Sequence, residues 1–204
     1  MEPLTPLPAH TLYLCYFGLK EPLVQTQVLP YLRQIREAGI SVSLLTFEPG
    51  SRQRPPEELQ AAQARLASEG IRWFHLPYHK RPSLPATVYD IVQGAWAASR
   101  YVQREGVTVL HARGHVGAAM GALAKQRAGG RLIFDIRGFM PEEYVDAGRW
   151  RAGGLRYRST KAAERRLIAA ADGFVVLTER ARAILFPGSR DTDPLGRPIE
   201  VIPC

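Results

Sequence analysis

The sequence predicts an α/β fold with a doubly wound, mostly parallel, Rossmann-like sheet. Two short apolar runs rich in β-branched residues, Val107–Leu110 and Leu132–Phe134, are typical of strands buried on both faces of a parallel sheet. Between them, Val116–Ala128 is small and apolar enough to form a crossover helix. Strands and helices alternate in this way along almost the whole chain, which favours a sheet with helices on both faces.

Strands are predicted where short apolar runs lie between turn or helix signals. The first precedes the loop Phe17–Pro22, and the last lies just before the end of the chain. Seven strands are expected, at residues 11–16, 40–46, 71–75, 107–110, 132–134, 174–177 and 199–202.

Helices are predicted where apolar residues recur at helical spacing and a stop signal follows. The first helix ends at Gly39, the second at Gly70, and the long helix with one apolar stripe ends at Gly106. Helices are expected at residues 24–38, 55–69, 84–105, 116–128, 155–171 and 179–185, with another start at Pro141.

Composition fits one domain with an anionic partner. The chain has 204 residues, 46% of them hydrophobic, and a formal net charge of +8 that comes mostly from arginine. Cys15 and Cys204 do not suggest a disulfide framework, so a reducing cytoplasm is expected. The N-terminus has no signal-peptide pattern and no run approaches membrane-spanning length. We expect one domain over residues 1–204, with residues 1–10 flexible.

Polar and basic residues follow the predicted strands. Because parallel strands end at the same rim of a sheet, the residues after the fourth and fifth strands should lie together, where open α/β sheets bind ligands. With the common strand order 3-2-1-4-5-6, Gly18–Lys20 would form the other wall of the crevice. The candidate residues are Gly18, Lys20, His111, Arg113, Gly114, His115, Asp135, Arg137 and Gly138.

Several of these residues have two interpretations. Gly18 could serve a turn or the close approach of a phosphate. His111 could be a core histidine or face a ligand. Asp135 and Arg137 could simply form a buried ion pair at the rim. All three alternatives stay open at the level of the sequence.

The stretch Arg149–Arg166 is rich in arginine and contains one acid, Glu164. A solvated helix face explains most such runs. The segment WRAGGLRYR, in which Trp150 and Tyr157 lie between arginines, could instead form a mobile element that meets a phosphate or a membrane interface.

Several common cofactor-binding and catalytic sites are excluded because the sequence lacks their motifs. No G-x-G-x-x-G follows the first strand, so nicotinamide and flavin cofactors are not expected, and there is no P-loop or G-x-S-x-G elbow. His75 and His79 lie either side of Pro77, so a shared helical metal site is not expected. No recognition helix or aromatic platform accompanies the basic charge, which argues against nucleic acid as a partner.

Five segments carry a family resemblance: PLVQTQVLPYLRQIREAGISVSLLTFEP, VTVLHARGH, RLIFDIRGFMPEEYVD, ERRLIAAADGFVVLT and IEVIPC. Their order and spacing resemble those of glycosyltransferase family 4 enzymes over nearly the whole chain. The resemblance implies the N-terminal, acceptor-side half of a GT-B enzyme, in which two Rossmann-like domains face each other across a cleft. It implies that the C-terminal, donor-binding domain is absent from this chain and that the chain alone has little or no activity.

The resemblance also implies a reaction and partners. A hexosyl group would pass from a nucleotide-sugar donor to a sugar or lipid-linked acceptor, with retention at the anomeric carbon and without a metal or cofactor, in carbohydrate biosynthesis. The implied location is the cytoplasm, with peripheral contact to an anionic membrane face as an open alternative. A non-catalytic binding module for an anionic metabolite or a membrane surface is the second hypothesis.

Residue roles follow from the same resemblance. The loop Gly18–Lys20 would approach the donor phosphate or the acceptor. Asp135 stands where many relatives carry a histidine that contacts the reacting sugar, so Asp135 and His111 are the catalytic candidates. The substrate-binding candidates are Gly18, Lys20, Arg113, Gly114, His115, Arg137 and Gly138.

Overall fold

The computed structural model describes residues 9–50 and 55–203. The expectation of a flexible segment over residues 1–10 lies, for residues 1–8, outside the described residues. It is wrong for His10, which begins the first strand and is buried. The His10 ring lies within hydrogen-bonding distance of the Ser43 hydroxyl and of the Glu105 backbone carbonyl, so both neighbouring elements hold it.

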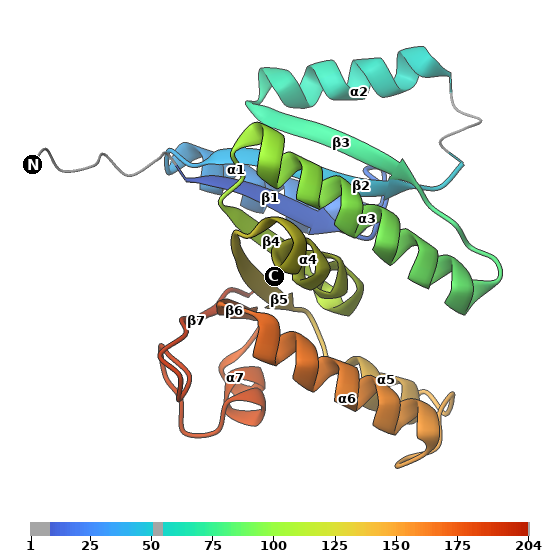
Figure 1. Cartoon of the computed structure of the whole chain (residues 1–204), viewed down its shortest axis with the longest axis vertical. Helices are drawn as coiled ribbons and strands as arrows, with labels where there is room; N and C mark the ends of the chain where they lie inside the picture. The colour runs from blue at the N-terminus through green and yellow to red at the C-terminus, as the bar shows by residue number, and fades with distance from the viewer. Residues whose placement is uncertain (1–8, 51–54, 204) are drawn as a thin grey trace, which may run out of the picture.

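The strands form one seven-stranded sheet in which all neighbours are parallel (Figure 1). The order is β3-β2-β1-β4-β5-β6-β7, which is the common order 3-2-1-4-5-6 considered above with one more strand at its end. Strands β2 and β3 are therefore added on one side of β1 and strands β4 to β7 on the other, so the order along the sheet reverses beside β1. The strands are β1 (His10–Cys15), β2 (Ser41–Glu48), β3 (Ile71–Pro77), β4 (Val109–Arg113), β5 (Arg131–Ile136), β6 (Gly173–Val176) and β7 (Ile199–Val201).

The predicted helices are present, and the predicted first helix has two parts. Residues Val24–Val28 form a π-helical turn, η1, in which the Leu29 N–H donates to the Val24 carbonyl. Pro30 follows and has no N–H to donate to the preceding turn, which favours a local change in helix type there. The helices are α1 (Leu29–Glu37), α2 (Pro56–Ser68), α3 (Ser83–Glu105), α4 (Gly114–Ala128), α5 (Met140–Asp146), α6 (Leu155–Ala170) and α7 (Glu179–Leu185).

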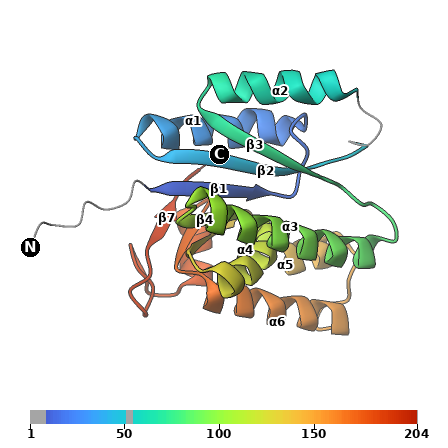
Figure 2. The same cartoon turned by 45° about the horizontal axis from the view of Figure 1, so that its top comes forward.

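Helices cover both faces of the sheet (Figure 2), and each face has its own core. Because side chains alternate along a strand, Leu12 and Leu14 of β1 pack with α3 and α4, whereas Tyr13 and Cys15 pack with η1, α1 and α2. Helices α6 and α7 extend the first core over β5, β6 and β7. The fold is therefore doubly wound, as predicted.

Two strands run further toward the rim than the hydrophobic pattern predicts. Strand β4 ends at Arg113 instead of Leu110, and β5 ends at Ile136 instead of Phe134. The added residues include Arg113 and Asp135, which are register partners on neighbouring strands. Opposite charges side by side allow polar residues to continue a buried strand, so the apolar run stops before the strand does.

Helix α4 packs very close to β1 at Gly117. A methyl group added there would lie 3.0 Å from the backbone oxygen of Leu14, which cannot move without shifting the strand. We predict that Gly117→Ala lowers the free energy of unfolding by about 1–3 kcal/mol, because overpacking outweighs the helix propensity gained. Urea unfolding of the two proteins checks this. If Gly117→Ala were more stable by about 1 kcal/mol, propensity alone would be acting and the close packing would be wrong.

Candidate functional site

A hollow of about 270 Å³ lies at the carboxyl ends of β1, β4 and β5, beside the point where the sheet order reverses. Open parallel sheets bind ligands at this position. The hollow brings together five predicted site residues: Arg113, Gly114, His115, Arg137 and Gly138. It is completed by Tyr16, Phe17, Leu23, Val116, Met140 and Glu143.

Arg113 brings a buried positive charge to this hollow. The residue is only 5% exposed, and its Nη2 atom donates a 2.6 Å hydrogen bond to Oε1 of Gln27 in η1. Its Nη1 atom is buried and makes no well-aligned hydrogen bond to any described residue. Guanidinium nitrogens without a partner are suited to bind a carboxylate or phosphate oxygen.

Asp135 is fully buried beneath the hollow and balances its charge. Its Oδ1 atom lies 2.6 Å from Nε of Arg137, and its Oδ2 atom accepts a 2.9 Å hydrogen bond from the Tyr13 hydroxyl. The structure thus favours the ion-pair interpretation of Asp135 and Arg137. Burial raises the pKa of Tyr13, the nearby Asp135 carboxylate adds to that rise, and Arg113 opposes it.

The expectation that the His111 side chain emerges at the rim is wrong. His111 lies inside β4, is 2% exposed, and packs against Tyr13 and Tyr31 with ring centroids 4.7 and 5.5 Å away. Its Nε2 atom is 3.9 Å from Oδ2 of Asp135. Burial lowers the pKa of His111 to about 4, despite the opposing effect of Asp135, so the ring is neutral at pH 7. Strand β4 continues past His111 to Arg113, whose register partner on β5 is Asp135.

His115, in the first turn of α4, is tied to α6. Its Nε2 atom lies 3.0 Å from Oε2 of Glu164, and Lys161 also binds Glu164. Burial alone would raise the pKa of Glu164, but the bonds to His115 and Lys161 hold that pKa below its usual value. His115 therefore lines the hollow with a ring whose position is fixed by a buried carboxylate.

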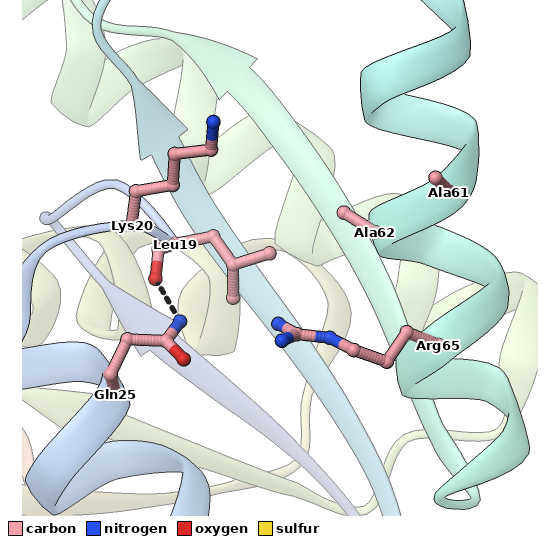
Figure 3. Close-up of a pocket in the computed structure, with 6 residues that line it drawn as sticks. All are labelled: Leu19, Lys20, Gln25, Ala61, Ala62 and Arg65. Carbon is pink, nitrogen blue, oxygen red and sulfur yellow. Dashed lines mark hydrogen bonds between the residues drawn. The ribbon is translucent and has the colours of Figure 1, made fainter.

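Gly18 and Lys20 lie apart from this hollow. A methyl group on Gly18 would meet Cδ of Pro49 at 2.9 Å and Oε2 of Glu48 at 3.2 Å, so the glycine permits close packing of the first loop against the end of β2. Lys20 forms a 2.7 Å ion pair with Glu58 of α2. It borders a second hollow of about 510 Å³, between the first loop and α2, together with Leu19, Gln25, Ala61, Ala62 and Arg65 (Figure 3).

Two buried acids that were not among the predicted site residues organise the rim. Glu48 is fully buried and accepts from the Leu19 backbone N–H and the Thr46 hydroxyl. Asp90 of α3 is also fully buried and accepts from the Tyr16 hydroxyl at 2.7 Å. Its Oδ1 atom is 2.6 Å from Nδ1 of His79, whose backbone N–H also donates to Asp90. In the sequence, the position of Asp90 within the apolar stripe of a predicted helix was the available sign that this acid is buried.

The residues that the structure describes contain no group of three or more histidine, cysteine, aspartate or glutamate side chains that could hold a metal ion. None of the helices over residues 9–50 and 55–203 is both long and apolar enough to cross a membrane.

The buried His111 predicts a pH dependence of stability. Its pKa in the folded state is below that of an unfolded histidine, so the unfolded chain binds the proton first as the pH falls. The neutral His111 ring makes its full contribution to the free energy of unfolding above about pH 6.5. That contribution is lost as the pH falls toward 4, a loss of roughly 3 kcal/mol. We expect His111→Phe, which keeps the ring packing, to lose markedly less stability over that range. Denaturant unfolding at several pH values checks this, and equal losses in the two proteins would contradict it.

The sequence matches a protein-family model described as "Glycosyl transferase 4-like domain" over residues 24–193. A comparison with curated protein sequences gives no match. The hollow, Arg113 and Asp135 all lie inside the matched segment.

Several solved structures have a similar fold. Sucrose-phosphate synthase from Thermosynechococcus elongatus is 14% identical, with a TM-score of 0.61 over 96% of this chain and 48% of that one. LpCGTa, solved in complex with UDP, is 13% identical, with a TM-score of 0.60 over 97% of this chain and 54% of that one. MurG from Acinetobacter baumannii is 16% identical, with a TM-score of 0.51 over 96% and 45%. The chain thus spans about half the length of these structures.

The family match and the fold agree with the resemblance inferred from the sequence. A seven-stranded, doubly wound parallel sheet is the Rossmann-like half of the GT-B architecture. The chain is a glycosyltransferase domain that belongs to the glycosyl transferase 4-like family.

Proposed function

We propose that this domain forms the acceptor side of the cleft in a retaining, nucleotide-sugar-dependent hexosyltransferase. The observation that carries the proposal is the buried Arg113 guanidinium, which lines the hollow at the sheet's reversal point with one nitrogen unpartnered among the described residues. The family match supplies the class of reaction.

Charge at the hollow suits the chemistry of sugar transfer. Negative charge develops on the departing diphosphate as the bond to the anomeric carbon breaks, and prearranged cations stabilise that charge. Arg113 and Arg137 both line the hollow. Asp135 forms an ion pair with Arg137, and the neutral His111 ring lies next to Asp135. Asp135 and His111 therefore act as positioning residues in the proposal. The backbone at Gly114 leaves room for a substrate to approach, whereas the Glu143 carboxylate occupies the space beside Gly138.

The donor would bind mainly to a second domain that faces this rim across the cleft. LpCGTa was solved with UDP, which supports a nucleotide diphosphate as the leaving group. The acceptor would be a sugar or a lipid-linked sugar, and no cofactor is required. We expect the domain alone to be inactive or nearly so, because the donor-binding half is a separate unit. The buried Cys15 thiol, whose pKa burial raises to about 12, suits a reducing cytoplasm.

Arg113 is the residue to test in a complete two-domain protein. We predict that Arg113→Ala lowers kcat/KM by about 100-fold, roughly 3 kcal/mol of lost stabilisation, and that Arg113→Lys recovers part of it. Gln27→Ala keeps the guanidinium and removes its partner, so a smaller loss is expected. Arg180→Ala, an exposed arginine on α7, is the control and should be unchanged. Unaltered turnover and acceptor affinity after joint alanine substitution of His111, Arg113 and Arg137 would overturn the proposal.

The second candidate function is a binding module that holds an anionic metabolite without transferring a sugar. The same Nη1 atom of Arg113, which makes no well-aligned hydrogen bond to any described residue, favours it. Calorimetric titration of this chain with inorganic pyrophosphate separates the two: a module should bind in the micromolar range, whereas half of a transferase cleft should bind weakly. Tight binding that is lost in Arg113→Ala would make the module the better account.

A further inference from the structure

One apolar surface of the domain is left uncovered by the fold. Leu84, Val88, Val92 and Trp96 of α3 lie four residues apart and are 74%, 52%, 57% and 51% exposed, so they form a continuous stripe along one side of the helix. We call these four residues the α3 stripe. Figure 1 shows α3 along the outside of the sheet, next to α4. Large apolar side chains that gather on one face usually mark an interaction surface.

The neighbouring helix extends this surface. Leu123 of α4 is 44% exposed and, with Val92 and Trp96, lines a hollow of about 430 Å³ between α3 and α4. Arg127 and Gln126 complete its far end. The surface thus combines a raised apolar stripe with a shallow groove beside it.

The charges around the stripe are almost all positive. Between Leu84 and Ser99, a stretch that the structure describes throughout, the one charged residue is Asp90, which is fully buried. Helix α4 contains no acidic residue. Basic residues flank both ends of the stripe: Lys80 and Arg81 before it, and Arg100, Arg104 and Arg127 after it.

Arg100 and Trp96 make a contact that suits a lipid headgroup region. The Arg100 guanidinium carbon lies 4.5 Å from the centre of the Trp96 ring. An aromatic ring with an apolar body and an adjacent cation fits the boundary between acyl chains and phosphates. The nearest acid further along α3, Glu105, is paired with Arg72 and so does not cancel these charges.

We propose that the α3 stripe and Leu123 are the surface by which this domain docks on an anionic lipid bilayer. The stripe would enter the headgroup layer, and the flanking arginines would bind lipid phosphates. A second copy of the chain fits less well. Because both ends of the stripe are basic, pairing two stripes in either orientation brings like charges together.

The basic helix α6, which the sequence singles out, is a poorer membrane surface. Its arginines are exposed, and two aromatic residues near its start contact α5. Trp150, which precedes α6, packs against Tyr144 with ring centroids 4.6 Å apart, and the Tyr157 hydroxyl donates to Glu142. Among the residues of α6, all of which the structure describes, Leu155 is the one large apolar side chain that is exposed, at 86%. The structure therefore places the surface on α3.

Docking through α3 would bring the bilayer close to the hollow. Helix α3 begins just after β3 reaches the carboxyl rim, and its Asp90 accepts from the hydroxyl of Tyr16, which lines the hollow. A lipid-linked acceptor in the bilayer would then lie near the hollow. Only this last point rests on the proposed transferase function, because the docking itself needs neither donor nor acceptor.

Co-sedimentation of this chain with vesicles tests the proposal. The vesicles contain phosphatidylglycerol and phosphatidylcholine in equal amounts, or phosphatidylcholine alone. We expect binding to the anionic vesicles that weakens at high salt, and a loss of at least about tenfold in Val92→Asp and Trp96→Asp, since a charge then enters the apolar layer. Arg100→Glu should lose roughly tenfold as well.

Two further variants are matched controls. Ile184→Asp places the same charge at an exposed apolar position of α7, and Leu155→Asp does so at the start of α6. Both should bind within about twofold of the parent chain. Circular dichroism shows that each variant is folded. Activity of the complete enzyme is a separate measurement, so failure of the transferase proposal would leave this result standing.

Three outcomes would overturn the proposal. The first is a parent chain that does not bind anionic vesicles at low salt. The second is a loss in Leu155→Asp or Ile184→Asp as large as that in Trp96→Asp. The third is a dimer in analytical ultracentrifugation that Trp96→Asp separates, which would assign the stripe to a second copy.

Discussion

The site depends on one constraint: charges buried at the carboxyl ends of parallel strands must be matched by opposite charges or hydrogen bonds. Arg113 ends β4, and its register partner on β5 is Asp135, which binds Arg137 and Tyr13. A buried carboxylate with no partner would cost several kcal/mol, so this arrangement holds three strands in place at once. The basic hollow exists because Asp135 lies directly beneath it.

The same device recurs around the rim. Glu48, Asp90 and Asp135 are all fully buried, and each fixes a different part of the site. Glu48 holds the first loop through the Leu19 N–H, whereas Asp90 joins His79 to Tyr16. A rim built this way presents its cations with little reorganisation, which is the property that electrostatic stabilisation of a leaving group requires. These three carboxylates are thus each bound by protein groups, and the two arginines Arg113 and Arg137 line the hollow together with Glu143.

Much of the fold could be predicted from the sequence, because a parallel sheet gives local signals. Apolar runs and glycine stops identified the seven strands and the helices, whereas the expected order of the first six strands rests on the commonest arrangement of this fold class. The ends of β4 and β5 could not be predicted, because both strands continue through charged residues. Arg113 and Asp135 are register partners that lie 22 residues apart in sequence, so no local pattern shows that they are neighbours. The π turn at Val24–Val28 depends on Pro30 and was also missed.

The candidate site was predicted less completely than the fold. Strand order placed five of the nine candidates on one hollow. It could not tell how deep His111 lies, since β4 continues for two more residues and buries it against Tyr13 and Tyr31. Nor could it show that Lys20 forms an ion pair with Glu58 of α2 and lies apart from the hollow. The exposure of the α3 stripe could not be predicted from the sequence either, because an apolar stripe on a crossover helix normally faces the sheet.

The proposal depends most on the Arg113 guanidinium, which would stabilise the charge that develops on the departing diphosphate. The most direct measurement is side-chain nitrogen NMR of a complete two-domain protein, with the Arg113 signal assigned by its loss in Arg113→Lys, during titration with nucleoside diphosphates. The account predicts that a diphosphate that binds shifts the Arg113 signal and leaves that of Arg180 unchanged. A diphosphate that binds without moving the Arg113 signal would contradict it.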